Sequence, residues 1–112
     1  MYNISDVTLA DKSVPTQNDQ VITCAMTGLS QTATVTWQDP DGSDISDGSS
    51  YTVVQGSESG GAQESLLTIK PTKLQSLGET STFTCIVVSG AYPDSGAVTK
   101  TMTLTTLTFG RY

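Results

Sequence analysis

Polar and apolar residues alternate along most of this chain, which is the pattern of β-strands with one buried face. Ile22, Cys24 and Met26, for example, fall together on one face of a run rich in Thr and Val. The alternation predicts seven or eight short strands, at 4–9, 20–26, 33–38, 51–55, 65–69, 80–88 and 98–104, with a very short one at 43–45. No apolar stripe has helical spacing, apart from one helical turn expected around Leu74 and Leu77.

Residues that favour turns separate these runs. Pro15 and Pro71 are expected to end strands, and Asp39-Pro40-Asp41-Gly42 combines a proline that presets one turn angle with a glycine that tolerates a positive φ. Many short strands divided in this way predict an all-β antiparallel sandwich of two sheets. The length of 112 residues suits a single domain, expected to span 1–112 with its core in 4–109.

Composition excludes several classes of function. There is no histidine, so His-based catalytic triads, His metal sites and imidazole pH switches are absent. A net charge of −6 argues against binding to nucleic acid or to anionic membrane surfaces. No apolar run approaches the ~20 residues of a membrane span. Thr and Ser together occupy 33 of the 112 positions.

The two cysteines, Cys24 and Cys85, lack the spacing of a zinc site, so they are either free thiols or one disulfide. A disulfide closing so long a loop would stabilise the domain by about 4 kcal/mol and would imply an oxidising compartment. The first residues have neither a basic start nor an apolar stretch. Met1 is therefore interpreted as a start residue added to an excised mature segment.

Cys24, Trp37 and Cys85 each lie on the apolar face of a different predicted strand. Together with their surroundings they resemble the immunoglobulin superfamily, particularly its I-type domains, over residues 4–104. The segments that carry the likeness are 67–69, 83–85 and Val35-Thr36-Trp37-Gln38-Asp39-Pro40-Asp41-Gly42-Ser43-Asp44-Ile45. The resemblance implies a two-sheet Greek-key sandwich with one inter-sheet disulfide between Cys24 and Cys85, and a core that includes Trp37, Phe83, Leu67 and Ile69.

The chain also departs from that family pattern. Phe83 stands where a corner tyrosine is usual, so its hydroxyl is lost, and Leu74 and Leu77 are expected to supply a substitute tether. No arginine opens the strand at Tyr51, and residues 38–51 leave room for one extra edge strand but hardly two. These features place the chain nearer the I-type than the variable type.

The most promising binding surface follows from the strand that carries Cys85. Because Cys85 points inward, Ile86 and Val88 are expected to point outward, at the centre of a weakly charged sheet face. Outward residues of the neighbouring strands and an aromatic loop residue complete the predicted partner-binding set, which is Ile86, Val88, Thr36, Gln38, Thr101 and Tyr92. A smaller outward pair, Val21 and Leu66, is expected on the opposite sheet.

Other chemistry has less support. Serine and threonine nucleophiles would lack a histidine base, so we expect no catalytic residues, no cofactor and no enzymatic activity. The acids between Asp39 and Asp47 do not have the spacing of an EF-hand and are interpreted as solvated turn residues, so no metal site is predicted. Asn3-Ile4-Ser5 is an N-glycosylation sequon.

These features favour a non-catalytic extracellular module for recognition or adhesion, in a secreted protein or in the ectodomain of a membrane protein. It would bind a protein partner, or a second copy as a homodimer, through the sheet face and the adjoining loops. The alternative is a structural spacer in a tandem immunoglobulin array with no ligand of its own. A calcium-dependent adhesion module is the weakest interpretation.

Overall fold

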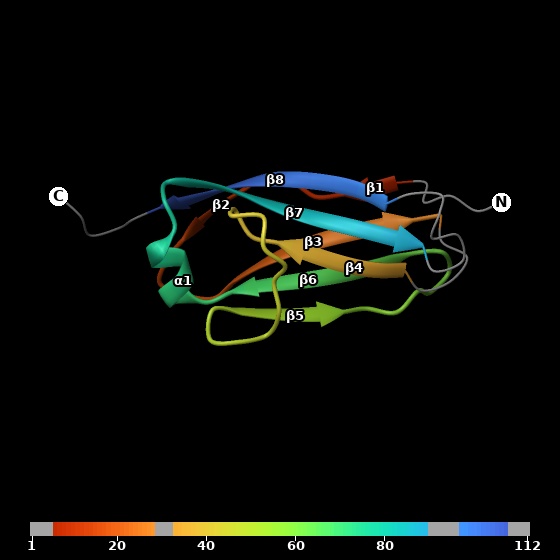
Figure 1. Ribbon diagram of the computed structural model, residues 1–112, viewed down its shortest axis with the longest axis horizontal. Helices are drawn as coiled ribbons and strands as arrows, with labels where there is room; N and C mark the ends of the chain where they lie inside the picture. Colours follow the sequence, from red (N-terminus) through yellow and green to blue (C-terminus); the bar gives the residue numbers. More distant parts are fainter. Residues whose placement is uncertain (1–5, 29–32, 90–96, 108–112) are drawn as a thin grey trace.

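The computed structural model describes residues 6–28, 33–89 and 97–107. Its strands form two four-stranded sheets that pack face to face (Figure 1). The first sheet has the order β1 (Asp6–Thr8), β3 (Gln20–Thr27), β6 (Gln63–Ile69), β5 (Tyr51–Gln55). The second has the order β2 (Lys12–Pro15), β8 (Ala97–Leu107), β7 (Thr80–Ser89), β4 (Ala33–Gln38). The predicted two-sheet all-β sandwich is therefore confirmed.

The alternation in sequence becomes alternation in burial. In β3, Ile22, Cys24 and Met26 are buried, whereas Val21 and Thr23, which flank Ile22, are exposed. The inward residues of both sheets form one continuous core, which contains Trp37, Phe83, Leu67 and Ile69 among its least exposed members. Burial of these side chains is the main favourable term in folding the sandwich.

The disulfide joins the two sheets through the middle of this core. Cys24 of β3 and Cys85 of β7 are bonded, with their Cα atoms 6.6 Å apart. Trp37 lies directly opposite Cys85 across the β4–β7 pair. Its indole Nε1–H donates a buried hydrogen bond of 2.9 Å to Ser65 Oγ on the other sheet. The covalent link and this polar contact therefore hold the two layers together at the same level.

The N-terminal segment contains one strand that the sequence analysis did not predict. The strand expected at 4–9 is present as β1 in the first sheet, and the chain then crosses to make β2 in the second sheet, where it runs parallel to β8. Pro15 belongs to β2 because an edge strand tolerates a residue without an N–H group. At the crossing, Asp11 Oδ1 accepts the Thr103 N–H at 2.8 Å.

The connection between β6 and β7 contains the short helix α1 (Pro71–Ser76), which confirms the expected helical turn. Pro71 begins the helix as well as ending the strand, as its fixed φ favours at a first helical position. Leu74 is completely buried, and Leu77 packs against the core. The helix lies at the end of the sandwich where β8 finishes (Figure 1). Among the described residues, no helix is long and apolar enough to cross a membrane.

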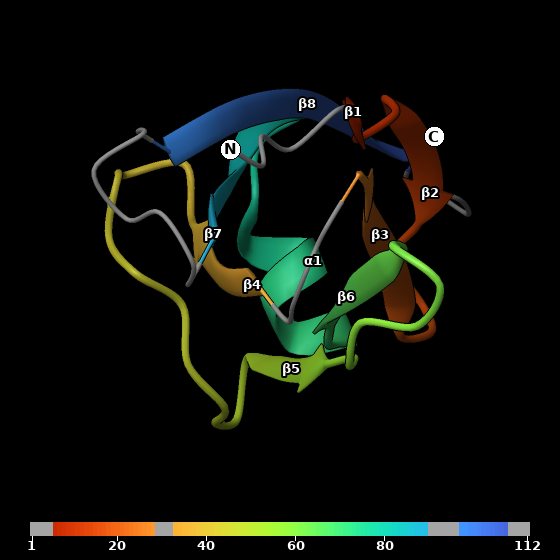
Figure 2. The same cartoon turned by 90° about the vertical axis from the view of Figure 1, so that its right-hand side faces the viewer.

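Residues 39–50 run along one open side of the sandwich between β4 and β5, drawn in yellow in Figure 2. The expected strand at 43–45 is reduced to one isolated bridge between Gln38 and Asp44. The Asp39 carboxylate accepts the N–H groups of Asp41 and Ser43 at 2.9 and 3.0 Å, which closes a tight turn. That turn uses backbone groups that a further strand beside β4 would need. Among the described residues, β4 is therefore the edge strand on this side of its sheet.

Candidate partner-binding surface

The outward face of the second sheet is rich in threonine. We call the part of it around Ile86 the threonine face, and it comprises Thr34, Thr36, Gln38, Thr82, Thr84, Ile86, Val88, Thr99, Thr101 and Thr103. Ile86 lies near its centre, opposite Thr36 on β4 and Thr99 on β8. No residue of the threonine face carries a charge, although the chain as a whole has 11 acidic and 5 basic residues.

The predicted partner-binding residues lie on this face, except for one. Ile86, Val88, Thr36 and Gln38 are half-buried, and Thr101 is exposed. Tyr92 lies outside the described residues, as do Asn3 and most of the two loops expected to add specificity. The two apolar side chains, Ile86 and Val88, are thus partly accessible at the surface of this face.

Threonines of β7 and β8 pair directly across the sheet. Thr82 lies opposite Thr103, and Thr84 lies opposite Thr101. Each threonine presents a methyl group and a hydroxyl, so the surface offers apolar contact and hydrogen bonds without the desolvation cost of buried charge. Such a surface suits contact with another uncharged protein surface.

Two glutamine side chains of the first sheet and one backbone N–H of the 39–50 segment cover the free edge of β4. Gln63, which is buried, accepts the Ala33 N–H at 2.8 Å and donates to the Ala33 carbonyl at 3.0 Å. Gln55 Nε2 donates to the Val35 carbonyl at 3.0 Å, and the Ile45 N–H donates to the Trp37 carbonyl at 2.8 Å. These contacts occupy groups that an added strand would need, so addition of a strand at this edge is disfavoured.

The sequence analysis missed this edge cover, although a signal for it existed. Gln63 and Ser65 stand at the inward positions of β6 that Leu67 and Ile69 continue. A polar residue at an inward position must find a buried partner. The identity of that partner depends on which strands of the opposite sheet lie across from it, and local alternation does not contain this information.

The opposite sheet carries more exposed apolar surface than predicted. Val21 is 40% exposed, and Leu66 is half-buried. Val54, which the sequence analysis did not assign to a face, is 50% exposed and lies directly opposite Leu66 across the β5–β6 pair. The pairing of β5 with β6 therefore adds Val54 to the outward surface of the first sheet.

Tyr51 has a buried hydroxyl in an apolar environment. Its ring packs edge-on against Phe83, and Lys73 Nζ lies 5.8 Å from the ring centre. The buried hydroxyl has no hydrogen-bond partner among the described residues. Desolvation by burial, with the nearby charges of Asp39 and Asp41, raises the Tyr51 pKa to about 12. A phenol held neutral in this way is no base or nucleophile at physiological pH.

The acids of the 39–50 segment act as local hydrogen-bond acceptors. Asp44 Oδ1 accepts from Gln38 Nε2 at 3.1 Å, and Asp47 Oδ1 accepts the Val53 N–H at 2.6 Å. Within the part of the chain that the structure describes, no three acidic or cysteine side chains gather in a way that could hold a metal ion. The role of these acids that the structure shows is to shape the turn and to cover part of the β5 edge.

Comparison with solved structures identifies the architecture. Titin M4 matches with a TM-score of 0.66 at 14% identity, over 96% of this chain and 99% of that one. The titin tandem domains A164–A165 match at 0.63 and 18% identity, over 93% of this chain and 46% of that one. Dpr1 IG1, solved bound to DIP-eta IG1, matches at 0.62 and 14% identity, over 94% of each chain. No protein-family model matches the chain, and no curated protein does.

Sequence identities this low establish the fold alone. The fold is an immunoglobulin-like sandwich of two sheets, bridged by the Cys24–Cys85 disulfide between β3 and β7. The similar structures include titin domains and an immunoglobulin domain in a complex with another one.

Proposed function

We propose that this chain is a single non-catalytic recognition domain that binds a protein partner through the threonine face, and that a second copy of the chain is the first partner to test. The observation that carries the proposal is the uncharged face around Ile86 and Val88, on a chain with 16 charged residues elsewhere. Gln38, Thr36 and Thr101 would supply the polar contacts around this apolar centre.

The binding mode follows from the protected edge. Because Gln63 and Gln55 occupy backbone groups of β4, addition of a strand there is disfavoured, and sheet-to-sheet contact remains. Contact between two copies through this face would be isologous, with Ile86 near the symmetry axis. Dpr1 IG1, solved bound to DIP-eta IG1, is an example of a similar fold in a complex with another immunoglobulin domain.

The test replaces Ile86 with lysine. Ile86→Lys places a charge at the centre of the threonine face, and we expect it to abolish self-association because the buried ammonium would have no partner. Val21→Lys is the matched control, since it puts the same residue at an outward strand position of the opposite sheet. Sedimentation over a concentration series, with circular dichroism to verify folding, distinguishes the two variants.

The alternative function is a structural spacer in a tandem array. It is favoured by the likeness to the titin tandem domains. A chain that stays monomeric at every concentration and is indifferent to Ile86→Lys would support the spacer and contradict self-association.

We further propose an extracellular location, in a secreted protein or an ectodomain. The disulfide supports this because such bonds persist in oxidising compartments. Glycosylation at Asn3 stays a prediction, as does a contribution of Tyr92 to partner binding.

A further inference from the structure

The β5–β6 hairpin ends in a turn that only glycines accommodate readily. Ser59 and Ala62 exchange two backbone hydrogen bonds of 2.8 and 3.0 Å. Gly60 and Gly61 between them both have positive φ, at 62° and 86°. This combination is the two-residue turn whose twist matches that of the flanking strands. The tip of the hairpin is therefore a regular structure rather than a slack loop.

Between this turn and the body of the sheet the hairpin bulges. The Gly56 N–H donates to the Glu64 carbonyl at 2.9 Å, and a side chain at position 56 would clash with that carbonyl oxygen. Beyond this pair, Ser57 and Glu58 together face the single residue Gln63. The extra residue makes a β-bulge, a feature that bends a strand and re-aims its side chains.

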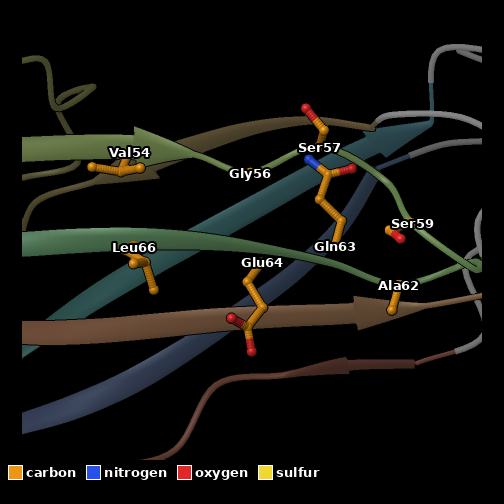
Figure 3. A pocket seen from close by; sticks show the side chains of 8 residues that line it. All are labelled: Val54, Gly56, Ser57, Ser59, Ala62, Gln63, Glu64 and Leu66. Atoms are coloured by element: carbon orange, nitrogen blue, oxygen red, sulfur yellow. The ribbon is translucent and has the colours of Figure 1, made fainter.

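A hollow of about 400 Å³ opens on the outward side of this bulged region (Figure 3). Val54, Leu66 and Ala62 supply its apolar lining, and Glu64, which points the same way as Leu66 and Ala62 in Figure 3, is its charged residue. Ser57 also lines the hollow, but its hydroxyl points the opposite way from Glu64. The hollow lies on the first sheet, at the end of the sandwich away from α1, so it is separate from the threonine face.

Glu64 is the one charged residue among those that line the hollow, and its charge is negative. Glu64 is exposed, and it has no ion pair with any residue in the described ranges. Of the described lysines, Lys12 donates to the Val21 carbonyl, and Lys73 lies over the Tyr51 ring. The hollow is thus an acidic site with an apolar floor, on a chain whose net charge is −6.

We propose that this hollow binds an arginine side chain of a protein partner. The aliphatic stem of arginine would lie against Val54 and Leu66, as long basic side chains do on apolar surfaces. Its guanidinium would pair with the Glu64 carboxylate, on which the planar fork can form two parallel hydrogen bonds. An apolar lining beside a single carboxylate identifies the occupant as a basic side chain with a long apolar stem, rather than an acidic or a purely apolar one.

The experiment titrates the isotope-labelled protein with the peptide acetyl-Val-Arg-Val-amide and follows backbone amide signals by NMR. We expect saturable shifts at Val54, Ser57 and Ala62. The same peptide with citrulline in place of arginine keeps the shape and loses the charge, and we expect it to bind about three- to five-fold more weakly.

Two variants identify the carboxylate responsible. Glu64→Gln should remove the preference for arginine over citrulline, whereas Asp19→Asn, which removes an exposed carboxylate far along the chain, should keep it. Ile86→Lys should also keep it, so failure of the proposed recognition face would leave this site intact. Equal binding of both peptides to the unmodified protein, or shifts confined to the threonine face, would overturn the proposal.

Discussion

Ser65 and Gln63 show how single polar residues organise this sandwich from within. Both point inward from β6, and both hydrogen-bond to β4 in the other sheet. A buried polar group without a partner costs on the order of 1–3 kcal/mol, so these contacts favour one alignment of the two sheets over its neighbours. The disulfide joins the layers, and these side chains specify how they face each other.

Tyr51 is the residue whose replacement gives the clearest pH effect. Its folded pKa of about 12 lies above the ordinary value of 10, so the unfolded chain loses this proton first as pH rises. The contribution of Tyr51 to the free energy of unfolding is therefore constant below pH 10. Between pH 10 and 12 the free energy of unfolding falls by about 1.4 kcal/mol per pH unit, the value for one proton.

Tyr51→Phe should remove this loss. At neutral pH we expect the variant to be as stable as the parent or slightly more stable, because the buried hydroxyl it deletes has no hydrogen-bond partner in the described structure. Urea unfolding at neutral and at alkaline pH measures both effects. A variant that loses stability in alkali as steeply as the parent would contradict the assignment.

At the scale of elements, the β5–β6 hairpin and the 39–50 segment before it offer a matched pair of glycines. Alanine at either Gly60 or Gly48 would meet no atom within 4 Å, yet only Gly60 has a positive φ, of 62°. Gly60→Ala should cost about 1 kcal/mol, because a side chain disfavours the left-handed conformation. Gly48→Ala should be neutral or slightly stabilising.

Thermal unfolding of the two variants tests this comparison, since packing differences are absent from both. If Gly60→Ala melted at or above the temperature of Gly48→Ala, the turn assigned to the hairpin would be wrong.

Most elements were predictable because local alternation is enough to define a strand. The runs around Cys24, Trp37 and Cys85 were placed correctly, and so was the helical turn at Leu74. The crossing from β1 to β2 was not predicted, since parallel pairing with β8 joins residues about 90 positions apart and leaves no local signal. Likewise, the sequence pattern placed Ile86 on an outward face but could not show that its side chain is half-buried there, because burial depends on residues of neighbouring strands.

At the scale of the molecule, the Cys24–Cys85 disulfide is the single bond expected to contribute most to the free energy of unfolding. It closes a loop with a sequence separation of 61. Restricting the unfolded chain in this way is worth about 4 kcal/mol, a large part of the total stability of a small domain.

Replacing both cysteines with alanine should therefore lower the free energy of unfolding by about 4 kcal/mol. Urea unfolding measures the loss, and unfolding of the parent with a reductant provides an independent comparison. A double variant with an unchanged midpoint would show that the sheets hold together without the link.

The two glutamines that hydrogen-bond to β4, Gln63 and Gln55, have a consequence for aggregation at high protein concentration. Two neighbouring copies cannot easily merge their sheets at this flank into a longer ribbon, the step by which β-rich proteins grow into fibrils. Within the described ranges, the outward faces of the two sheets have no such cover over their side chains, so the proposed contact through the threonine face is compatible with protection of this edge. The substitution Ile86→Lys on that face would leave the glutamine contacts at β4 in place.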